Sequence, residues 1–171
     1  EQQNSFERNL NSVLDRMSRE EIVMQASSDL MQRVITLGVQ ASSEALPPEG
    51  RELIAIEIST IRDELLQLAN HKDPNGHYTF AGSKINTKPF VDDGTGNIVY
   101  AGDNGRVTVN VSEHREITVK KPGSEVFTAV IRDEAGVDTR KSFFDVLQDF
   151  ETAIRADDSD GIALGFSELT D

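Results

Sequence analysis

The chain has 171 residues, the length of one domain or of two small ones. Hydrophobic residues make up 37% of it, and no apolar run approaches the ~18 residues that a membrane span needs. Its 30 acidic and 17 basic residues give a net charge of −13, which argues against binding to nucleic acid or to an anionic membrane. The absence of Cys excludes a disulfide framework, a thiolate metal site and a cysteine nucleophile. Three His and no Trp leave few candidates for a catalytic base or an aromatic ligand cleft.

Neither end of the sequence carries a helix-capping signal. Residue 1 is Glu, Phe6–Leu10 is typical of a helix interior, and Gly161–Asp171 stops inside a helix-like pattern. We therefore expect a core excised from a longer protein, so that a targeting signal at either end would lie outside this sequence.

Residues 1–45 contain no Pro and one Gly, and their apolar positions repeat at steps of four and three residues. This spacing predicts one long helix with an apolar seam, interrupted at Glu21 and Ser28. The seam consists of Leu10, Leu14, Met17, Met24, Met31 and Ile35. A helix of about 45 residues extends about 65 Å, so it needs partner helices along its length, from this chain or from segments outside it.

Two consecutive prolines, Pro47 and Pro48, end this helix because neither can continue it. A second helix is predicted to follow at once, with Arg62 and Glu64 in solvent. Its apolar face consists of Leu53, Ile54, Ile58, Ile61, Leu65 and Leu68. A short linker between two apolar stripes predicts an antiparallel helical hairpin.

The helical periodicity breaks at His71–Gly76, where Asp-Pro and Asn-Gly are turn dipeptides, and Asn70 is placed to cap the preceding helix. Alternating residues then predict about five or six short strands, with turns at Gly94–Gly96 and Asp103–Gly105. The strand candidates are Tyr78–Phe80, Val107–Val111, Ile117–Val119 and Val126–Ile131. We expect a small antiparallel β domain over residues 77–132.

Helical periodicity returns near Ser142, a candidate N-cap with Asp145 three residues on. Phe143, Val146, Leu147, Phe150 and Ile154 share one face of this helix. Asp157–Gly161 is predicted to be a loop, and Ile162, Leu164, Phe166 and Leu169 begin a last helix. The expected fold class is therefore α+β. A helical rod domain over residues 1–76 continues in residues 140–171, and the β domain is inserted between its helices.

Few motifs indicate chemistry. His71, Asp73 and His77 lie close together in a turn, but the spacing of a zinc site is missing, so we interpret them as an exposed connector. The acidic loops Asp92–Asn97 and Asp157–Gly161 lack the spacing of a calcium loop and its final Glu. Gly94-Thr95-Gly96 lacks the third glycine of a dinucleotide loop and is interpreted as a hairpin turn.

The remaining polar residues considered for catalysis or modification are also explained without a functional site. The carboxylate pairs Glu20-Glu21, Asp92-Asp93 and Asp157-Asp158 follow from the acidic composition, whereas acid–base catalysis needs two carboxylates in a desolvated cleft. Ser42, Ser43 and His114 lack the context of an activated nucleophile. Asn110–Ser112 matches a glycosylation sequon, a pattern that is common by chance. The sequence therefore singles out no catalytic, cofactor-binding or metal-binding residue.

The stretch Ile61–Asn70, followed by Asp73–Gly82, closely resembles the hook-associated protein 3 family, the hook–filament junction proteins of bacterial flagella. The resemblance continues through Lys88–Phe90, Val99–Asp103, Pro122–Phe127 and Phe144–Leu147. Residues 30–41 look like a helix that this family shares with the flagellins. The resemblance covers most of the chain, and its most specific part is the pattern Asn-Gly-x-Tyr-x-Phe-x-Gly beside Leu-Leu-x-Leu-Ala-Asn.

The resemblance implies a structural protein without catalytic activity or cofactor, exported by the flagellar type III apparatus to the outside of the cell. It implies a ring of copies between the first hook-associated protein and the flagellin filament. Family members carry terminal segments that form the inner tube, and one of these would bind an export chaperone. We expect those segments to be missing from this sequence, which by itself should be monomeric, with residues 1–30 less protected than 50–70.

Two alternatives remain. A flagellin, or the other hook–filament junction protein, would share the helix around Arg33–Ala41, but the Asn75–Phe80 stretch and the small β insert favour the junction family. A ligand-binding or enzymatic module would need a concave site with convergent polar groups, which the sequence does not suggest.

Overall fold

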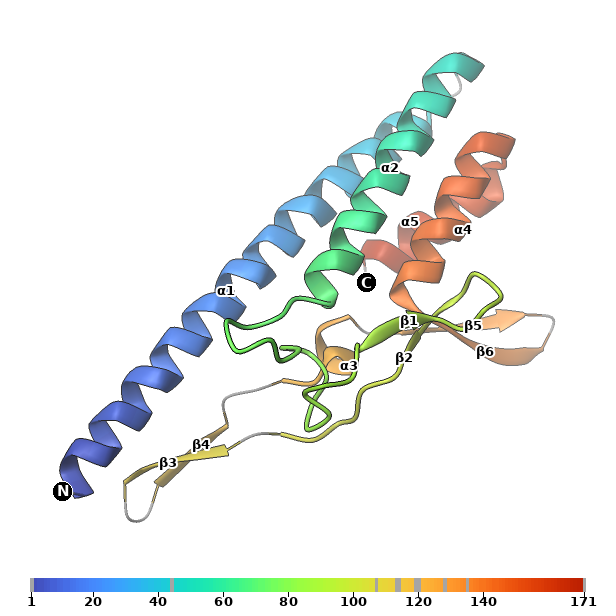
Figure 1. Ribbon diagram of the computed structural model, residues 1–171. Coiled ribbons are helices and arrows are strands. Elements are labelled where there is room, and N and C mark those ends of the chain that lie inside the picture. Colours follow the sequence, from blue (N-terminus) through green and yellow to red (C-terminus); the bar gives the residue numbers. More distant parts are fainter. Residues whose placement is uncertain are drawn as a thin grey trace.

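The computed structural model describes residues 2–43, 45–106, 108–112, 115–118, 121–127, 129–134 and 136–170, and the side chains of all of these except 2–5, 111 and 134. The elements in chain order are α1 (Gln2–Ala41), α2 (Pro48–Ala69), β1 (Phe90–Asp92), β2 (Ile98–Tyr100), β3 (Thr108–Ser112), β4 (Arg115–Thr118), α3 (Gly123–Val126), β5 (Val130–Glu134), β6 (Val137–Lys141), α4 (Phe143–Ala156) and α5 (Ser159–Thr170). In Figure 1, α1 and α2 form a long rod, α4 and α5 lie beside its upper half, and the hairpins lie near its lower part. The predicted α+β class is confirmed.

The two long helices form the antiparallel hairpin that the proline pair predicts. α1 has 40 residues and extends about 60 Å, but it ends at Ala41 rather than continuing to Leu46. The Nη1 of Arg51 donates to the Ala41 carbonyl oxygen over 3.2 Å, which satisfies a carbonyl that the helix end leaves free. α2 begins with Pro48, whose missing N–H is no loss in a first helical turn.

α1 buries a different face from the predicted seam. Its buried apolar residues are Val13, Val23, Val34, Leu37 and Ala41. Leu10, Leu14, Met17 and Met24 of the seam are 41–55% exposed, and we call these four residues, together with Met31 and Ile35, the α1 stripe. The reason is length, because the 22 residues of α2 accompany only about half of the 40 residues of α1.

α2 packs between α1 and α4, and it buries most of its predicted face. Ile54, Ile58, Ile61 and Leu65 are buried. Leu53 was expected on that face but is 69% exposed, and Glu64 is exposed as predicted. The prediction that Arg62 lies in solvent is wrong: its Nε donates to the Phe144 carbonyl oxygen over 3.0 Å and its Nη2 to Gln148 Oε1 over 2.9 Å. Arg62 therefore links α2 to the first turns of α4.

α4 and α5 complete the helical core. Ser142 caps α4 as predicted, its Oγ accepting the N–H of Asp145 over 3.1 Å. The predicted loop Asp157–Gly161 is shorter than expected, because α5 already begins at Ser159. Asp157 ends α4 in the left-handed conformation, at φ 54°. Gly165 lets α5 approach α4 closely, since a Cβ at this position would lie 2.6 Å from Cδ2 of Phe150.

The middle of the chain forms three separate two-stranded antiparallel hairpins, β1–β2, β3–β4 and β5–β6, rather than one sheet. Their registers place Val91 opposite Val99, Val109 opposite Ile117 and Arg132 opposite Thr139. The β3–β4 hairpin lies against α1, and the other two lie near the first turns of α4 (Figure 1). The expected strand residues Val107 and Val119, and also His114, lie outside the described residues.

Two predicted strands are wrong, and three observed strands were not among the candidates: β6, and also β1 and β2, for which only the turn between them was predicted. Tyr78–Phe80 makes only a single bridge, from Tyr78 to Lys72, inside a series of turns. Val126–Ile131 begins at the end of a short helix, because the N–H of Phe127 donates to the Gly123 carbonyl oxygen and β5 starts only at Val130. β6 escaped prediction because its residues, Val-Asp-Thr-Arg-Lys, scarcely alternate between apolar and polar.

A cluster of aromatic rings joins the hairpins to the helices. Phe90 of β1 lies 5.3 Å from Phe144 of α4, and Phe127, which follows α3, lies 5.6 Å from Phe90 and 5.7 Å from Phe144 between ring centroids. All three rings are buried, so the β region and the helical rod share one continuous core. Among the described helices, none combines the length and the apolar character needed to span a membrane.

Candidate functional site

The residues considered for a metal site form a turn. Asp73 Oδ1 accepts the N–H of Asn75 over 2.9 Å and of His77 over 3.0 Å, the geometry of an Asx turn. Burial raises the pKa of Asp73, but these two N–H donors and the charges of His77 and Arg16 outweigh burial and hold the pKa below its ordinary value. Nδ1 of His71 lies 3.3 Å from Thr79 Oγ1, away from the turn. Within the described residues, no group of three or more metal-ligating side chains comes together.

The acidic loops use their carboxylates on their own backbones. Asp92 Oδ1 accepts the N–H of Gly94 and of Gly96, and Asp93 Oδ1 accepts both the N–H and the hydroxyl of Thr95. The bonds from Thr95 lower the pKa of Asp93. Gly94 and Gly96 have φ near 90°, as the turn between β1 and β2 requires. These side chains shape a hairpin and do not converge on a ligand.

The most specific part of the sequence resemblance is held in place by hydrogen bonds from distant segments. We call this part, Phe80–Gly82 with Tyr100, Asp103 and Gly123, the Phe80 cluster. The Tyr100 hydroxyl lies 2.9 Å from the carbonyl oxygen of Phe80 and 2.8 Å from that of Asp103. Gly82 has φ 67°, and a Cβ there would overlap the Asp103 carbonyl. The N–H of Gly123 donates to the Phe80 carbonyl over 2.8 Å. The pattern around Phe80 is therefore explained by close packing and by these hydrogen bonds.

Asn70 joins the end of α2 to β1. Its Nδ2 donates to the Phe90 carbonyl oxygen over 3.0 Å, and its Oδ1 accepts the Phe90 N–H over 2.9 Å. A side-chain amide thus takes the place of a neighbouring strand at the edge of β1. Sequence reasoning identified Asn70 only as a helix cap, because nothing in its own segment indicates a partner twenty residues away.

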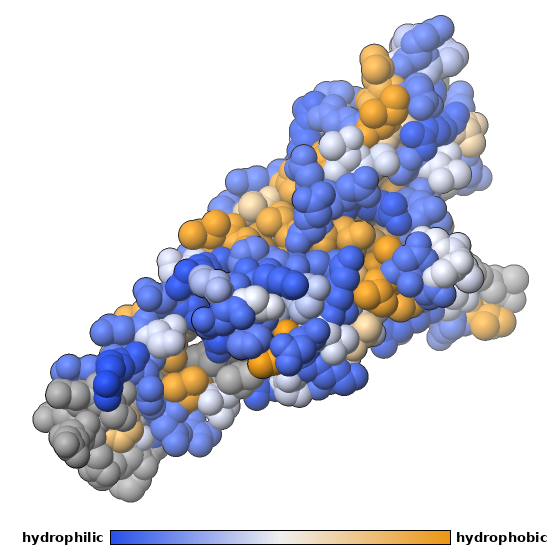
Figure 2. Space-filling view, viewed as in Figure 1, coloured by the Kyte–Doolittle hydropathy of each residue, from blue (hydrophilic) through white to orange (hydrophobic). Residues whose placement is uncertain are grey.

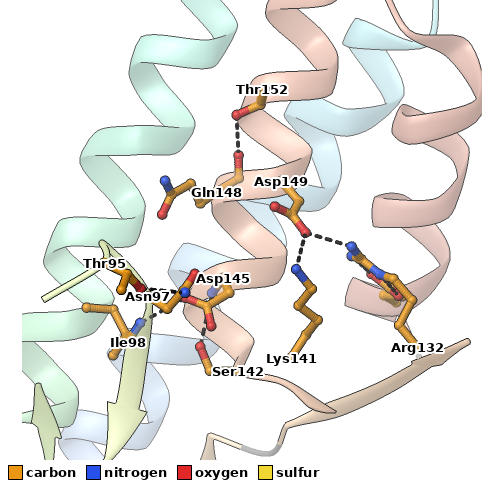
Figure 3. Close-up of polar contacts among 11 residues, drawn as sticks. Thr95, Asn97, Ile98, Arg132, Lys141, Ser142, Asp145, Gln148, Asp149 and Thr152 are labelled. Atoms are coloured by element: carbon orange, nitrogen blue, oxygen red, sulfur yellow. Dashed lines mark hydrogen bonds and ion pairs between the residues drawn. The ribbon is translucent and has the colours of Figure 1, made fainter. Parts of the chain in front are cut away.

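Asp145 joins α4 to β2. Its Oδ1 accepts the N–H of Ile98 over 2.9 Å, while its own N–H donates to Ser142 Oγ (Figure 3). The residue is 9% exposed. The capping pattern identified Asp145 from the sequence, but its bond to the edge of β2 depends on tertiary structure.

Arg132 holds the β5–β6 hairpin against α4 and α5. Its Nε and Nη2 donate to the two carboxylate oxygens of Glu168 over 2.9 and 2.6 Å, and its Nη1 donates to Asp149 Oδ2 over 2.6 Å. The ammonium of Lys141 lies 3.7 Å from the same Asp149 oxygen (Figure 3). The bonds to Glu168, and then those to Asp149, raise the pKa of Arg132 although burial opposes this. The sequence carries no signal for this network, because Arg132 and Glu168 are 36 residues apart.

Two grooves with apolar side chains in their lining lie along the α1 stripe. A groove of about 550 Å³ runs between Met17 and Met24 of α1 and a wall formed by Arg106, Thr118 and Lys121. A second groove of about 220 Å³ continues it from Met24 to Met31, with Leu65, Phe127 and Phe143 on its other side. Figure 2 shows apolar patches of this kind along the rod among hydrophilic residues. This continuous surface suits the apolar face of another helix.

Comparison with known proteins gives consistent results over most of the chain. The family model for the bacterial flagellin N-terminal helical region matches residues 1–85. Flagellar hook-associated protein 3 of Salmonella typhimurium is 32% identical over 145 residues, which are 82% of this chain and 44% of that protein. The protein of the same name from Escherichia coli K12 is 31% identical over 115 residues, 67% of this chain and 35% of that protein. The chain belongs to the flagellar hook-associated protein 3 family. It spans less than half the length of these two relatives.

Solved structures share the fold across nearly the whole chain. The crystal structure of Xanthomonas campestris FlgL has a TM-score of 0.81 and 21% identity, with 98% of this chain and 84% of that chain covered. The Legionella pneumophila flagellar hook associated protein-3 has a TM-score of 0.83 and 16% identity, with 99% and 86% covered. The shared fold therefore covers the hairpin region of this chain as well as its rod.

Proposed function

We propose that this protein is a structural subunit of the bacterial flagellum, exported to the outside of the cell, where it forms the junction between hook and filament. The family membership supports this role. The whole of the described architecture serves to hold a long rod rigid and to attach short hairpins to it. A junction between two tubes needs such a subunit, because its task is to transmit force between neighbours.

The observation that carries the proposal is the α1 stripe with its two grooves. The stripe follows α1 over several helical turns, and contiguous exposed apolar residues mark interaction sites. Because the curated relatives are more than twice as long as the matched region, helical segments of the longer protein are the natural occupants. We propose that these segments cover the stripe and continue into the tube wall.

We further propose that residues 1–76 and 140–171 act as the rod domain and residues 77–132 as an inserted β domain. In the ring, copies of the protein would contact one another laterally. The first hook-associated protein and the flagellin filament would lie at the two ends, and an export chaperone would bind a terminal segment outside this sequence. The high negative charge would keep the subunit soluble before assembly.

A structural role without catalysis is supported by what the polar side chains do. Asp73, Asp92, Asp93, Asp103 and Asp145 each accept backbone N–H groups. Carboxylates used in this way hold the backbone in place and are not directed at a substrate. We therefore propose no active site.

A flagellin remains the second candidate, because the family model that matches residues 1–85 describes the flagellin N-terminal region. The two functions differ in the product of assembly. Electron microscopy of the purified parent protein should show no long filaments if it is a junction subunit, and long filaments if it is a flagellin.

The deciding experiment is complementation of a strain from which the gene is deleted. The deletion should give cells that lack filaments and release filament subunits into the medium, and the gene should restore motility. A gene carrying Met24→Asp in the α1 stripe should fail to restore it, whereas Ser18→Asp, an equal charge at an exposed polar position of α1, should restore it. Filaments on the deletion strain, or equal activity of the two variants, would contradict the proposal.

A further inference from the structure

The β5–β6 hairpin, which we call the arm, projects from the side of the molecule that carries α4 and α5 (Figure 1). In an antiparallel pair, successive residues of a strand point to opposite faces. Arg132 and Lys141 lie on the face that is bound to Asp149 and Glu168. An isolated two-stranded hairpin is only marginally stable in water, so this attachment fixes the direction in which the arm points.

The opposite face of the arm is exposed and amphipathic. The register places Ile131 opposite Arg140 and Asp133 opposite Asp138 on this face. Ile131 is 71% exposed, and the three charged residues are exposed as well. Neither Asp138 nor Arg140 forms an ion pair within the described part of the chain.

Two features of this face indicate a missing partner. Like charges directly opposite each other destabilise a strand pair, and neither Asp133 nor Asp138 forms an ion pair with any residue that the structure describes. Asp133 also accepts the Gly136 N–H in the turn over 2.7 Å, which leaves its second oxygen available. A partner surface with a cation opposite the two aspartates and an apolar residue opposite Ile131 would neutralise the like charges and bury the exposed isoleucine.

We propose that this face of the arm binds α1 of a neighbouring copy around Ile22. The inference rests on the proposed ring and names one of its lateral contacts. Ile22 is 66% exposed and lies outside the α1 stripe. Arg19 lies one turn before it, and Asp15 and Asp29 lie two turns to either side, all exposed and on the same side of α1.

The charges of the two surfaces are complementary. Arg19 faces the aspartates of the arm when Ile22 meets Ile131, and Asp15 or Asp29 then faces Arg140. Leu53 and Ile56 of α2 offer a weaker match, because Glu49 would repel the aspartates and Glu52 is already paired with Arg155, whose Nε lies 3.2 Å from its Oε2.

The contact is heterologous, because it joins two different surfaces of the subunit, and a contact of this kind forms a ring when its rotation closes. The arm and α1 lie on opposite sides of α2 in Figure 1, as a contact that continues around a ring requires. The contact involves only a few residues and so falls well below the ~800 Å² per partner of a stable pair. It therefore acts within the assembled ring and leaves the isolated chain monomeric.

Cysteine cross-linking tests the contact directly, because these 171 residues contain no Cys. The protein is expressed from its own gene with Ile22→Cys and Ile131→Cys, and isolated flagella are oxidised. The pair should give a ladder of covalent multimers, whereas each single variant should not. The matched control combines Ile131→Cys with Leu53→Cys, which is as exposed as Ile22 (69%), and should give no ladder.

Charge reversal provides a second measurement that does not depend on cysteines. Asp138→Arg should reduce the amount of the protein in isolated flagella about tenfold, since like charges across an interface are strongly unfavourable. Arg19→Glu in the same gene should restore the amount, and Arg16→Glu should not.

The outcomes separate this contact from the proposed function. Functional flagella with no ladder from the Ile22–Ile131 pair, or with an equal ladder from the Leu53 control, would overturn the contact and leave the junction role intact. Failure of Arg19→Glu to rescue Asp138→Arg would also overturn it. If the unmodified gene fails to complement the deletion strain, the junction role fails whatever the cross-links show.

Discussion

Replacing Arg132 with Met is the most direct test of how the arm is attached. The guanidinium is 13% exposed and its partner Glu168 is 9% exposed, whereas Asp149 is 42% exposed. Removing one member of a buried ion pair typically costs ~3–5 kcal/mol, because the other charge remains buried. The exposed pair with Asp149 adds only ~0.2–1 kcal/mol. Because Arg132 and Glu168 are both only partly buried as whole residues, we expect a smaller loss, of about 2 kcal/mol in the free energy of unfolding.

The measurement is urea denaturation followed by circular dichroism, since the chain has no Trp. Arg140→Met is the matched control, because Arg140 is an exposed arginine on the opposite face of the same hairpin, and it should change the stability by less than about 0.5 kcal/mol. Adding Glu168→Gln to Arg132→Met should cost little more than Arg132→Met alone, because the pair is already broken. If Arg132→Met is no more destabilising than Arg140→Met, the arm is held by something other than this ion pair.

Three further predictions concern the helices and the Phe80 cluster. Gly165→Ala should destabilise the protein by about 1–2 kcal/mol in thermal unfolding, because overpacking against Phe150 outweighs the gain of ~1 kcal/mol in helix propensity; a rise in stability would contradict the close approach. Hydrogen bonds from the Ser83 hydroxyl and from backbone N–H groups lower the pKa of Asp103 below its ordinary 3.8. The ionised side chain therefore adds to the free energy of unfolding above pH 3.8, and this stabilisation is lost as the pH falls through the lower pKa of the folded protein. Asp103→Asn should therefore flatten the fall in urea midpoint below pH 3.8, and an unchanged acid profile would count against this. Hydrogen exchange should be faster over residues 6–30 than over 50–69, since no helix of the described chain covers the first half of α1; equal protection would mean that the stripe is packed.

The sequence predicted local features well where one segment contains all the information. The Ser142 cap, the buried faces of α2 and α4, and the turn at Gly94–Gly96 all follow from residues within a few positions of one another. It failed at Tyr78–Phe80, where alternation indicated a strand. There the Phe80 side chain and backbone are bound by distant residues, which override the local preference.

The candidate chemical residues show the same division. The sequence indicated correctly that Asp73 and the loop at Asp92 lie in turns, because Asx and glycine turns are local. It gave no indication of Arg132 with Glu168, of Asn70 with Phe90, or of Asp145 with Ile98. The type of a polar residue shows only which groups it can bind, whereas its actual partner depends on which distant residues the fold brings close to it.

What the sequence determined by itself is therefore the set of elements: long helices with apolar stripes, a proline break, glycine turns and an acidic composition. Tertiary structure alone decided that α1 buries Val13, Val23 and Val34 while the part of the α1 stripe from Leu10 to Met24 stays exposed, and that the strands form three separate hairpins. The physical reason is that periodicity defines a face of a helix or strand, whereas burial depends on which other segment reaches that face. α2 is too short to cover the first half of α1, so the surface left there is the one that another chain segment must complete.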